Sequence, residues 1–129
     1  QMQMVENTFR SYQKACGNYD VEQILNHWDL RRLPGARGLS NEELFSSMKS
    51  AILKMAQSGG LKRVVNGKDY SVSIKPGQRD LIELRSGNFI WHFVRTPLGW
   101  RIVYQEEFLM VSDDSLLASN SLSGVAVLD

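Results

Sequence analysis

The chain has 129 residues, the size of one domain with a single hydrophobic core. Hydrophobic residues make up 43% and charged residues 22%, a globular composition that excludes a disordered, collagen-like or coiled-coil protein. The formal net charge of +1 argues against nucleic-acid binding, the single cysteine excludes a disulfide framework, and no apolar run approaches the roughly 20 residues of a membrane span.

Two helices are predicted at the start of the chain. Apolar residues at spacings of 4, 3 and 4 give the first helix one buried face, made of Val5, Phe9, Tyr12 and Cys16. Gly17-Asn18 should end this helix, after which Asp20 offers an N-cap with Gln23 as its capping-box partner. The second, short helix has the apolar stripe Val21, Ile24, Leu25 and Trp28.

The third helix has the clearest start. Ser40 and Glu43 match a capping box, and Leu39 and Leu44 occupy the two positions of a hydrophobic staple. A helical period of apolar residues then continues to Gly59-Gly60. The preceding segment, 31–39, contains glycines and a proline and is expected to be a loop.

After Gly60 the apolar period changes to two, which predicts strands. Asn66-Gly67 is expected to form a type I′ turn between strands at 61–65 and 68–75. Three more strands are predicted at 80–85, 88–95 and 99–110. The predicted class is therefore α+β, with three N-terminal helices on one face of a curved, mainly antiparallel sheet of about five strands.

Turn lengths decide which strand residues share a face. With Ser86-Gly87 as a two-residue loop and 96–99 as a four-residue loop, Trp91 pairs with Ile82 and with Tyr104. The face that the helices should cover then carries Ile82, Leu84, Phe89, Trp91, Phe93, Ile102, Tyr104 and Glu106.

The opposite face is half apolar, which suits a contact between two copies of the chain. His92 would be a hydrogen-bonded residue of that contact, with a general base as the alternative. The predicted dimer interface comprises Ile90, His92, Val94, Arg101, Val103 and Gln105.

The segment FIWHFVRTPLGWRIVYQEEF, residues 89–108, and the break at Gly17-Asn18-Tyr19-Asp20 point to a known family. From about residue 4 to 110 the chain resembles the nuclear transport factor 2-like superfamily, which includes SnoaL-like and ketosteroid-isomerase-like proteins. The resemblance implies a cone-shaped fold with a pocket between helices and sheet. It also implies a homodimer, and it is compatible with either a small-molecule enzyme or a binding module.

The predicted pocket holds the candidate catalytic residues. A Tyr104 hydroxyl and a Glu106 carboxylate beside aromatic walls could polarise a carbonyl and move a proton. The alternative is that Tyr104 is a core aromatic and Glu106 is exposed near the strand end. His27 is a third candidate, although it lies about 100° around the helix from Trp28, which favours a surface or cap role. The predicted pocket lining is Trp28, Trp91, Phe93, Tyr104 and Glu106.

No metal site or cofactor is predicted, because the two histidines and one cysteine are widely separated. Cys16 is expected to be a small buried hydrophobe. Nucleic-acid binding is not expected, because the aromatic residues alternate with aliphatic ones on a core face.

The domain is predicted to span residues 1–110, followed by an extension at 111–129. This extension is rich in serine, has three aspartates and no basic residue, and ends in an apolar run at 125–128. That run suits a last strand or a segment that docks on a partner. A start at Gln1 fits a cytoplasmic protein, or an exported one after removal of a signal segment, so no compartment is assigned.

The sequence leaves three function hypotheses, the last of which is an exported or membrane-associated accessory domain that has lost an upstream segment. The first is a non-catalytic dimeric binding or assembly module with a pocket for a small apolar ligand or a protein segment. The second is a small-molecule isomerase, dehydratase or hydrolase that uses Tyr104 and Glu106, with His27 as a helper.

Overall fold

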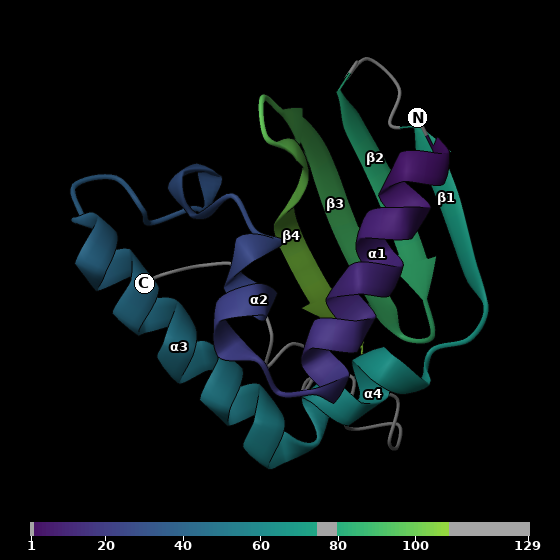
Figure 1. Ribbon diagram of the computed structural model, residues 1–129, viewed down its shortest axis with the longest axis horizontal. Coiled ribbons are helices and arrows are strands. Elements are labelled where there is room, and N and C mark those ends of the chain that lie inside the picture. Colours follow the sequence, from purple (N-terminus) through teal and green to yellow (C-terminus); the bar gives the residue numbers. More distant parts are fainter. Residues whose placement is uncertain (1, 75–79, 109–129) are drawn as a thin grey trace.

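The computed structural model describes residues 2–74 and 80–108, and within them four α-helices and a short 3-10 helix precede a four-stranded antiparallel sheet (Figure 1). The predicted α+β class is confirmed. The predicted extension at 111–129 lies outside the described residues. The elements are α1 (Met2–Gly17), α2 (Val21–Asn26), η1 (Leu30–Arg32), α3 (Asn41–Ser58), α4 (Gly60–Asn66), β1 (Tyr70–Ile74), β2 (Leu81–Ser86), β3 (Phe89–Thr96) and β4 (Gly99–Glu107).

The predicted starts of α2 and α3 are confirmed by their caps. The Asp20 carboxylate accepts a hydrogen bond from the Gln23 backbone N–H at 3.2 Å. Ser40 Oγ accepts from the Glu43 N–H at 3.1 Å, and the Glu43 carboxylate accepts from the Ser40 N–H at 2.8 Å. The Ser40 backbone N–H holds the pKa of Glu43 below its ordinary value, because this bond favours the charged carboxylate.

The predicted first hairpin is wrong, because residues 61–65 belong to α4. Val64 is fully buried, and Gln13 of α1 donates through Nε2 to the carbonyls of Val64 and Gly67, both at 3.0 Å. Packing against α1 thus outweighs the strand preference of two adjacent valines. Gly67 has φ −68° and makes no type I′ turn; a side chain there would overlap Ser86 Oγ.

The sheet has the order β1-β2-β3-β4, and each neighbouring pair is antiparallel. The β2–β3 turn is Gly87-Asn88, so Leu84 pairs with Trp91 instead of Phe89. Because this register shift is two residues, every β2 and β3 side chain stays on its predicted face.

A β-bulge interrupts the pairing of β3 with β4. Phe93 pairs with Ile102 as predicted, but the preceding residue, His92, pairs with Tyr104. Val103 is therefore the extra residue of β4, and every later residue of the strand changes face relative to the prediction.

The bulge makes three predicted placements wrong. Gln105, predicted for the dimer interface, is fully buried on the face that the helices cover, and Glu107 is buried there too. Tyr104 and Glu106, predicted for the covered face beside Trp91, lie on the open face, opposite His92 and Ile90 of β3.

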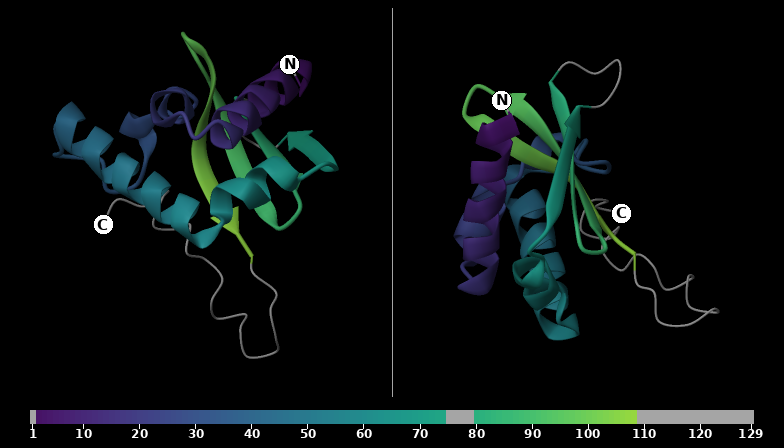
Figure 2. Two further views of the ribbon diagram at one scale, coloured as in Figure 1. Left: turned by 60° about the horizontal axis from the view of Figure 1, so that its bottom comes forward. Right: turned by 90° about the vertical axis from the view of Figure 1, so that its right-hand side faces the viewer.

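The helices α1 to α4 lie on one side of the sheet (Figure 2). The Phe9 ring of α1 packs on Trp91 at a centroid distance of 4.8 Å and on Tyr70 at 5.6 Å, and Phe89 stacks on Trp91 at 5.0 Å. Trp91 is fully buried at the centre of this core.

The chain after α2 pairs with the outer edge of β4. The Ile102 N–H donates to the His27 carbonyl at 2.7 Å, and the Asp29 N–H donates to the Ile102 carbonyl at 2.9 Å. This short parallel bridge satisfies edge groups of the sheet and fixes the His27 backbone beside β4.

Candidate functional site

A buried polar cluster occupies the space between helices and sheet. The Gln105 side-chain oxygen accepts from the Tyr12 hydroxyl at 2.7 Å and from the Trp91 indole N–H at 2.5 Å, and its amide nitrogen lies 3.4 Å from Met55 Sδ. Burial raises the pKa of Tyr12 well above its ordinary value. These buried polar groups are paired with one another, so the cluster is part of the core.

The predicted ligand pocket is replaced by this packed core. Three of its predicted walls, Trp28, Trp91 and Phe93, are 5%, 0% and 0% exposed. The other two, Tyr104 and Glu106, lie on the opposite face of the sheet.

Glu107 is a second buried polar group of β4. Its carboxylate, 1% exposed, binds the Arg63 guanidinium of α4 through both oxygens, with Nη2 donating to Oε1 at 3.0 Å. Arg63 Nη1 also donates to the Ser58 carbonyl at 3.0 Å. The pair therefore links the end of β4 to the junction of α3 and α4.

The candidate catalytic pair Tyr104 and Glu106 forms a hydrogen bond on the open face. The Tyr104 hydroxyl donates to the Glu106 carboxylate, and its ring stacks on His92 at 4.8 Å. Partial burial, with the Glu106 bond and charge, raises the pKa of Tyr104 to about 12. A phenol with that pKa keeps its proton at neutral pH, and the pair lies on the face of the sheet opposite the aromatic side chains predicted to enclose it.

The rest of the open face carries charges of both signs. His92 Nε2 lies 3.3 Å from Glu83 Oε1, and the same carboxylate accepts from Arg85 Nε at 2.8 Å. Of the other residues predicted for the dimer interface, Val94 is buried, and those half-buried are Ile90, Arg101 and Val103.

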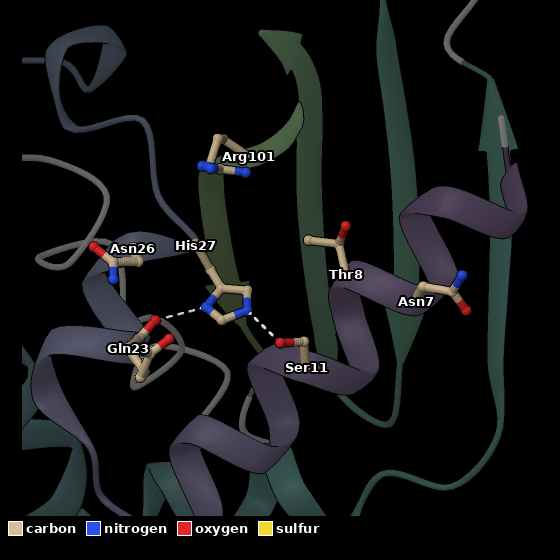
Figure 3. A pocket seen from close by; sticks show the side chains of 7 residues that line it. All are labelled: Asn7, Thr8, Ser11, Gln23, Asn26, His27 and Arg101. Atoms are coloured by element: carbon tan, nitrogen blue, oxygen red, sulfur yellow. Dashed lines mark hydrogen bonds between the residues drawn. The ribbon is translucent and has the colours of Figure 1, made fainter. Parts of the chain in front are cut away.

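Ser11 of α1 and His27 at the end of α2 form a hydrogen-bonded pair (Figure 3). His27 Nε2 lies 2.9 Å from Ser11 Oγ, and His27 Nδ1 lies 2.6 Å from the Gln23 backbone oxygen. Because a carbonyl oxygen only accepts, Nδ1 of the neutral ring carries the hydrogen. Nε2 then accepts from the Ser11 hydroxyl.

A hollow of about 370 Å³, here called the Arg101 hollow, opens beside this pair between α1, α2 and β4 (Figure 3). Among the described residues that line it, Arg101 is the one cationic side chain, and none is a carboxylate. Burial lowers the pKa of His27, the Gln23 carbonyl opposes that shift, and the charge of Arg101 adds to it. The lining residues are Asn7, Thr8, Ser11, Gln23, Asn26, His27 and Arg101.

A second hollow of about 320 Å³, the Lys14 hollow, is also bordered by this pair. Ser11, Gln23 and His27 line both hollows, so the Ser11–His27 pair borders both parts of one groove between α1 and α2. The further residues of this hollow are Lys14, Ala15, Asn18 and Asp20.

The structure also has a more apolar hollow of about 330 Å³ between α1, α3 and α4. Cys16 lies at its wall but is only 3% exposed, and burial raises the pKa of its thiol to about 12. Cys16 is therefore the small buried residue that the sequence predicts, and its thiol keeps its proton at neutral pH. The other lining residues are Gly17, Tyr19, Ala56, Leu61, Lys62, Val65 and Asn66.

Sequence reasoning selected His27 but not its partner Ser11. Each of them adjoins an aromatic residue of its helix stripe, Tyr12 or Trp28, and therefore lies on the flank of that helix. These flank positions are the only feature of the sequence that points to a contact between Ser11 and His27. Whether two flanks meet depends on how α1 and α2 pack.

Within residues 2–74 and 80–108, His, Cys, Asp and Glu side chains form no group of three that could hold a metal ion. In the same part of the chain, no helix has both the length and the apolar character needed to cross a membrane. Comparison of the chain with protein-family models, curated proteins and solved structures finds no match.

Proposed function

We propose that the protein is a binding module for a small anionic molecule, which occupies the Arg101 hollow. The observation that carries this proposal is the lining of the hollow, in which six polar or hydroxyl side chains surround Arg101 and none of the described lining residues is a carboxylate. A planar guanidinium binds a carboxylate or a phosphate through two parallel hydrogen bonds. The side-chain amides of Asn7, Gln23 and Asn26 supply further N–H donors.

The walls of the hollow come from elements that are already attached to one another. Ser11 bonds to His27, and the His27 carbonyl bonds to β4 at Ile102. A site whose walls are held before binding loses little conformational entropy when the ligand enters. This arrangement supports a preformed site on the surface in place of the predicted pocket inside the core.

The test is an NMR titration of the labelled protein with succinate and with inorganic phosphate. We expect resonances of Ser11, His27 and Arg101 to shift, and Arg101→Gln to weaken binding about tenfold or more, because a hydrogen bond to a charged group contributes roughly 1.5–3 kcal/mol. The matched control Arg37→Gln removes the same charge from the exposed 31–39 loop and should leave the dissociation constant unchanged. Equal weakening by both variants, or no shift at His27 with either anion, would contradict the proposal.

A second candidate function is assembly of two copies through the open face of the sheet. Its support is the composition of that face, where half-buried Ile90 and Val103 lie among side chains of both charge signs, such as Glu83 and Arg85. A two-fold axis can bring such a surface against itself with opposite charges in register. The helices α1 to α4 all lie on the other side of the sheet (Figure 2).

Sedimentation at micromolar concentration tests this assembly. The wild type should have the mass of two chains, and Ile90→Glu should have the mass of one, because it buries a charge in the contact. Leu98→Glu makes the same type of change in the exposed β3–β4 turn and should remain dimeric. A wild-type protein with the mass of one chain would refute the dimer.

The nuclear transport factor 2-like cone remains our proposal for the finer description of the fold. Its support is the order of the elements, with α1, α2 and α3 before the sheet, together with the placement of the helices on one side of the sheet (Figure 2). A crystal structure with helices on both faces of the sheet would contradict it.

A further inference from the structure

The hydroxyl of Ser11 has a different kind of hydrogen-bond partner from the hydroxyl of Thr8 on the same helix. Thr8, three residues earlier, donates through Oγ1 to the Met4 carbonyl at 2.9 Å, as hydroxyls inside helices commonly do. Ser11 Oγ instead lies 2.9 Å from His27 Nε2, which accepts its hydrogen. Ser11 is also exposed to solvent, so a molecule in the groove can reach Oγ.

The imidazole of His27 is held at both ring nitrogens and through its backbone. The ring donates from Nδ1 to the Gln23 carbonyl at 2.6 Å, which leaves Nε2 as the acceptor that faces Ser11. The His27 N–H donates to the Ile24 carbonyl at 3.2 Å, and the His27 carbonyl accepts from Ile102 at 2.7 Å. A serine hydroxyl that donates to a histidine, itself oriented by a third group, is the arrangement that activates serine as a nucleophile.

We propose that Ser11 is the nucleophile, and His27 the general base, of an esterase activity toward esters of small dicarboxylic acids. This inference rests on the anion site proposed above, because Arg101 would bind the second carboxylate of the acyl group. The alcohol part would then lie in the Lys14 hollow, since the Ser11–His27 pair lines that hollow as well as the Arg101 hollow.

The reaction needs only the ester and water. Ser11 Oγ attacks the ester carbonyl carbon, the Oγ–C bond forms, and the hydroxyl proton moves to His27 Nε2. When the bond to the alcohol oxygen breaks, that proton passes to the leaving alcohol, which gives acyl-Ser11. Water then attacks the acyl carbon and loses a proton to Nε2; the acid leaves, and Ser11 Oγ recovers the proton.

The protonation state of His27 suits this role. Burial and the charge of Arg101 lower the pKa of the imidazole against the opposing effect of the Gln23 carbonyl, so the neutral ring predominates at pH 7. The other titratable or charged groups around the ring are Lys14, Asp20 and Tyr12, whose ring lies 5.8 Å from the imidazole. The rate should therefore increase with pH and level off, with a midpoint below 6.5.

The test compares mono-4-nitrophenyl terephthalate, whose rigid ring keeps its free carboxylate away from its own ester, with neutral 4-nitrophenyl benzoate. We expect nitrophenol release above the buffer rate and, by mass spectrometry, a terephthaloyl group on the peptide that contains Ser11. Ser11→Ala should reduce release to the buffer rate, and His27→Gln should lower it about 10²- to 10⁴-fold. Ser47→Ala, which removes an exposed hydroxyl from α3, is the matched control and should have wild-type activity.

Arg101→Gln tests the proposed binding of the acyl group. It should raise KM for the terephthalate ester about tenfold and leave KM for the benzoate ester unchanged. An acyl group found on Lys14, or activity retained in Ser11→Ala, would refute the nucleophile. Binding of succinate or phosphate at His27 without acylation by either ester would refute the esterase and leave the binding function standing. Hydrolysis that depends on Ser11 but not on Arg101 would support the nucleophile and contradict the anion site.

Discussion

The two halves of β4 differ in what their side chains do. Before the bulge at Val103, Ile102 packs into an apolar core, and its backbone bonds to the segment that follows α2. After the bulge, the covered face receives Gln105 and Glu107, which bond to side chains of α1 and α4. The first half thus positions a surface site, and the second half ties the helices to the sheet.

This difference separates polar groups available for chemistry from polar groups used for stability. Gln105 and Glu107 are at most 1% exposed, and their hydrogen bonds go to Tyr12, Trp91 and Arg63. The Ser11–His27 pair lies one residue from Tyr12 along α1, yet it is open to two hollows. Burial, more than residue type, decides which polar groups can meet a ligand.

Among the changes that test this difference between the two halves of β4, deletion of Val103 should lower the stability of the protein most. Without the extra residue, Gln105 and Glu107 would turn to the open face, and the Tyr12 hydroxyl and Trp91 N–H would lose their acceptor. We expect the free energy of unfolding to fall by more than about 4 kcal/mol. Urea unfolding followed by circular dichroism measures this loss.

The control for the deletion is Val103→Ala, which keeps the residue count and hence the bulge. It should destabilise the protein by about 1 kcal/mol or less, since Val103 is only half-buried. Equal stability of the deletion and the alanine variant would show that the bulge does not govern the faces of β4.

Gln105→Leu keeps the bulge and removes only the shared acceptor. Two buried donors, on Tyr12 and Trp91, then lack a partner at roughly 1–3 kcal/mol each, so a loss of about 3 kcal/mol is expected. The exposed Gln57→Leu should change stability by less than about 0.5 kcal/mol in the same unfolding assay. A loss no greater than that of Gln57→Leu would mean that the cluster is not needed for stability.

His27, held at the first half of β4, should make stability depend on pH. Its pKa in the folded chain lies below the 6.5 of an ordinary histidine, so the unfolded chain binds more protons between the two pKa values. Stability should therefore decrease as the pH falls through and below 6.5. The urea midpoint is measured at about pH 7.5 and at about pH 5.5. The difference between the two midpoints should be larger for the wild type than for His27→Gln. Equal differences would show that His27 does not cause the pH dependence.

The smallest stability change is expected on the open face. Tyr104→Phe removes a partly exposed hydrogen bond to Glu106 and should change stability by about 0.5 kcal/mol or less. Glu106→Gln should bring the pKa of Tyr104 down from about 12 toward 10.0, because the carboxylate contributes to the shift. Alkaline titration of tyrosine absorbance, with Tyr104→Phe subtracted, measures this change, and an unaltered pKa would leave burial as the sole cause.

The sequence by itself determined the elements whose signals are local. The capping box at Ser40 and Glu43, the cap at Asp20 and the alternation along β2 and β3 involve residues within four positions of one another. Such patterns need no knowledge of what packs against them. They predicted the α+β class. They also predicted which side chains of β2, β3 and the part of β4 up to Ile102 face the helices.

Only the tertiary structure decided the rest. Residues 61–65 form a helix because Gln13 binds the carbonyls at its end, and the bulge is stabilised by buried partners of Gln105 on α1 and β3. Ser11 meets His27 through the packing of α1 on α2. Each of these outcomes depends on groups 14 to 93 positions apart in sequence, and no local pattern encodes such a contact.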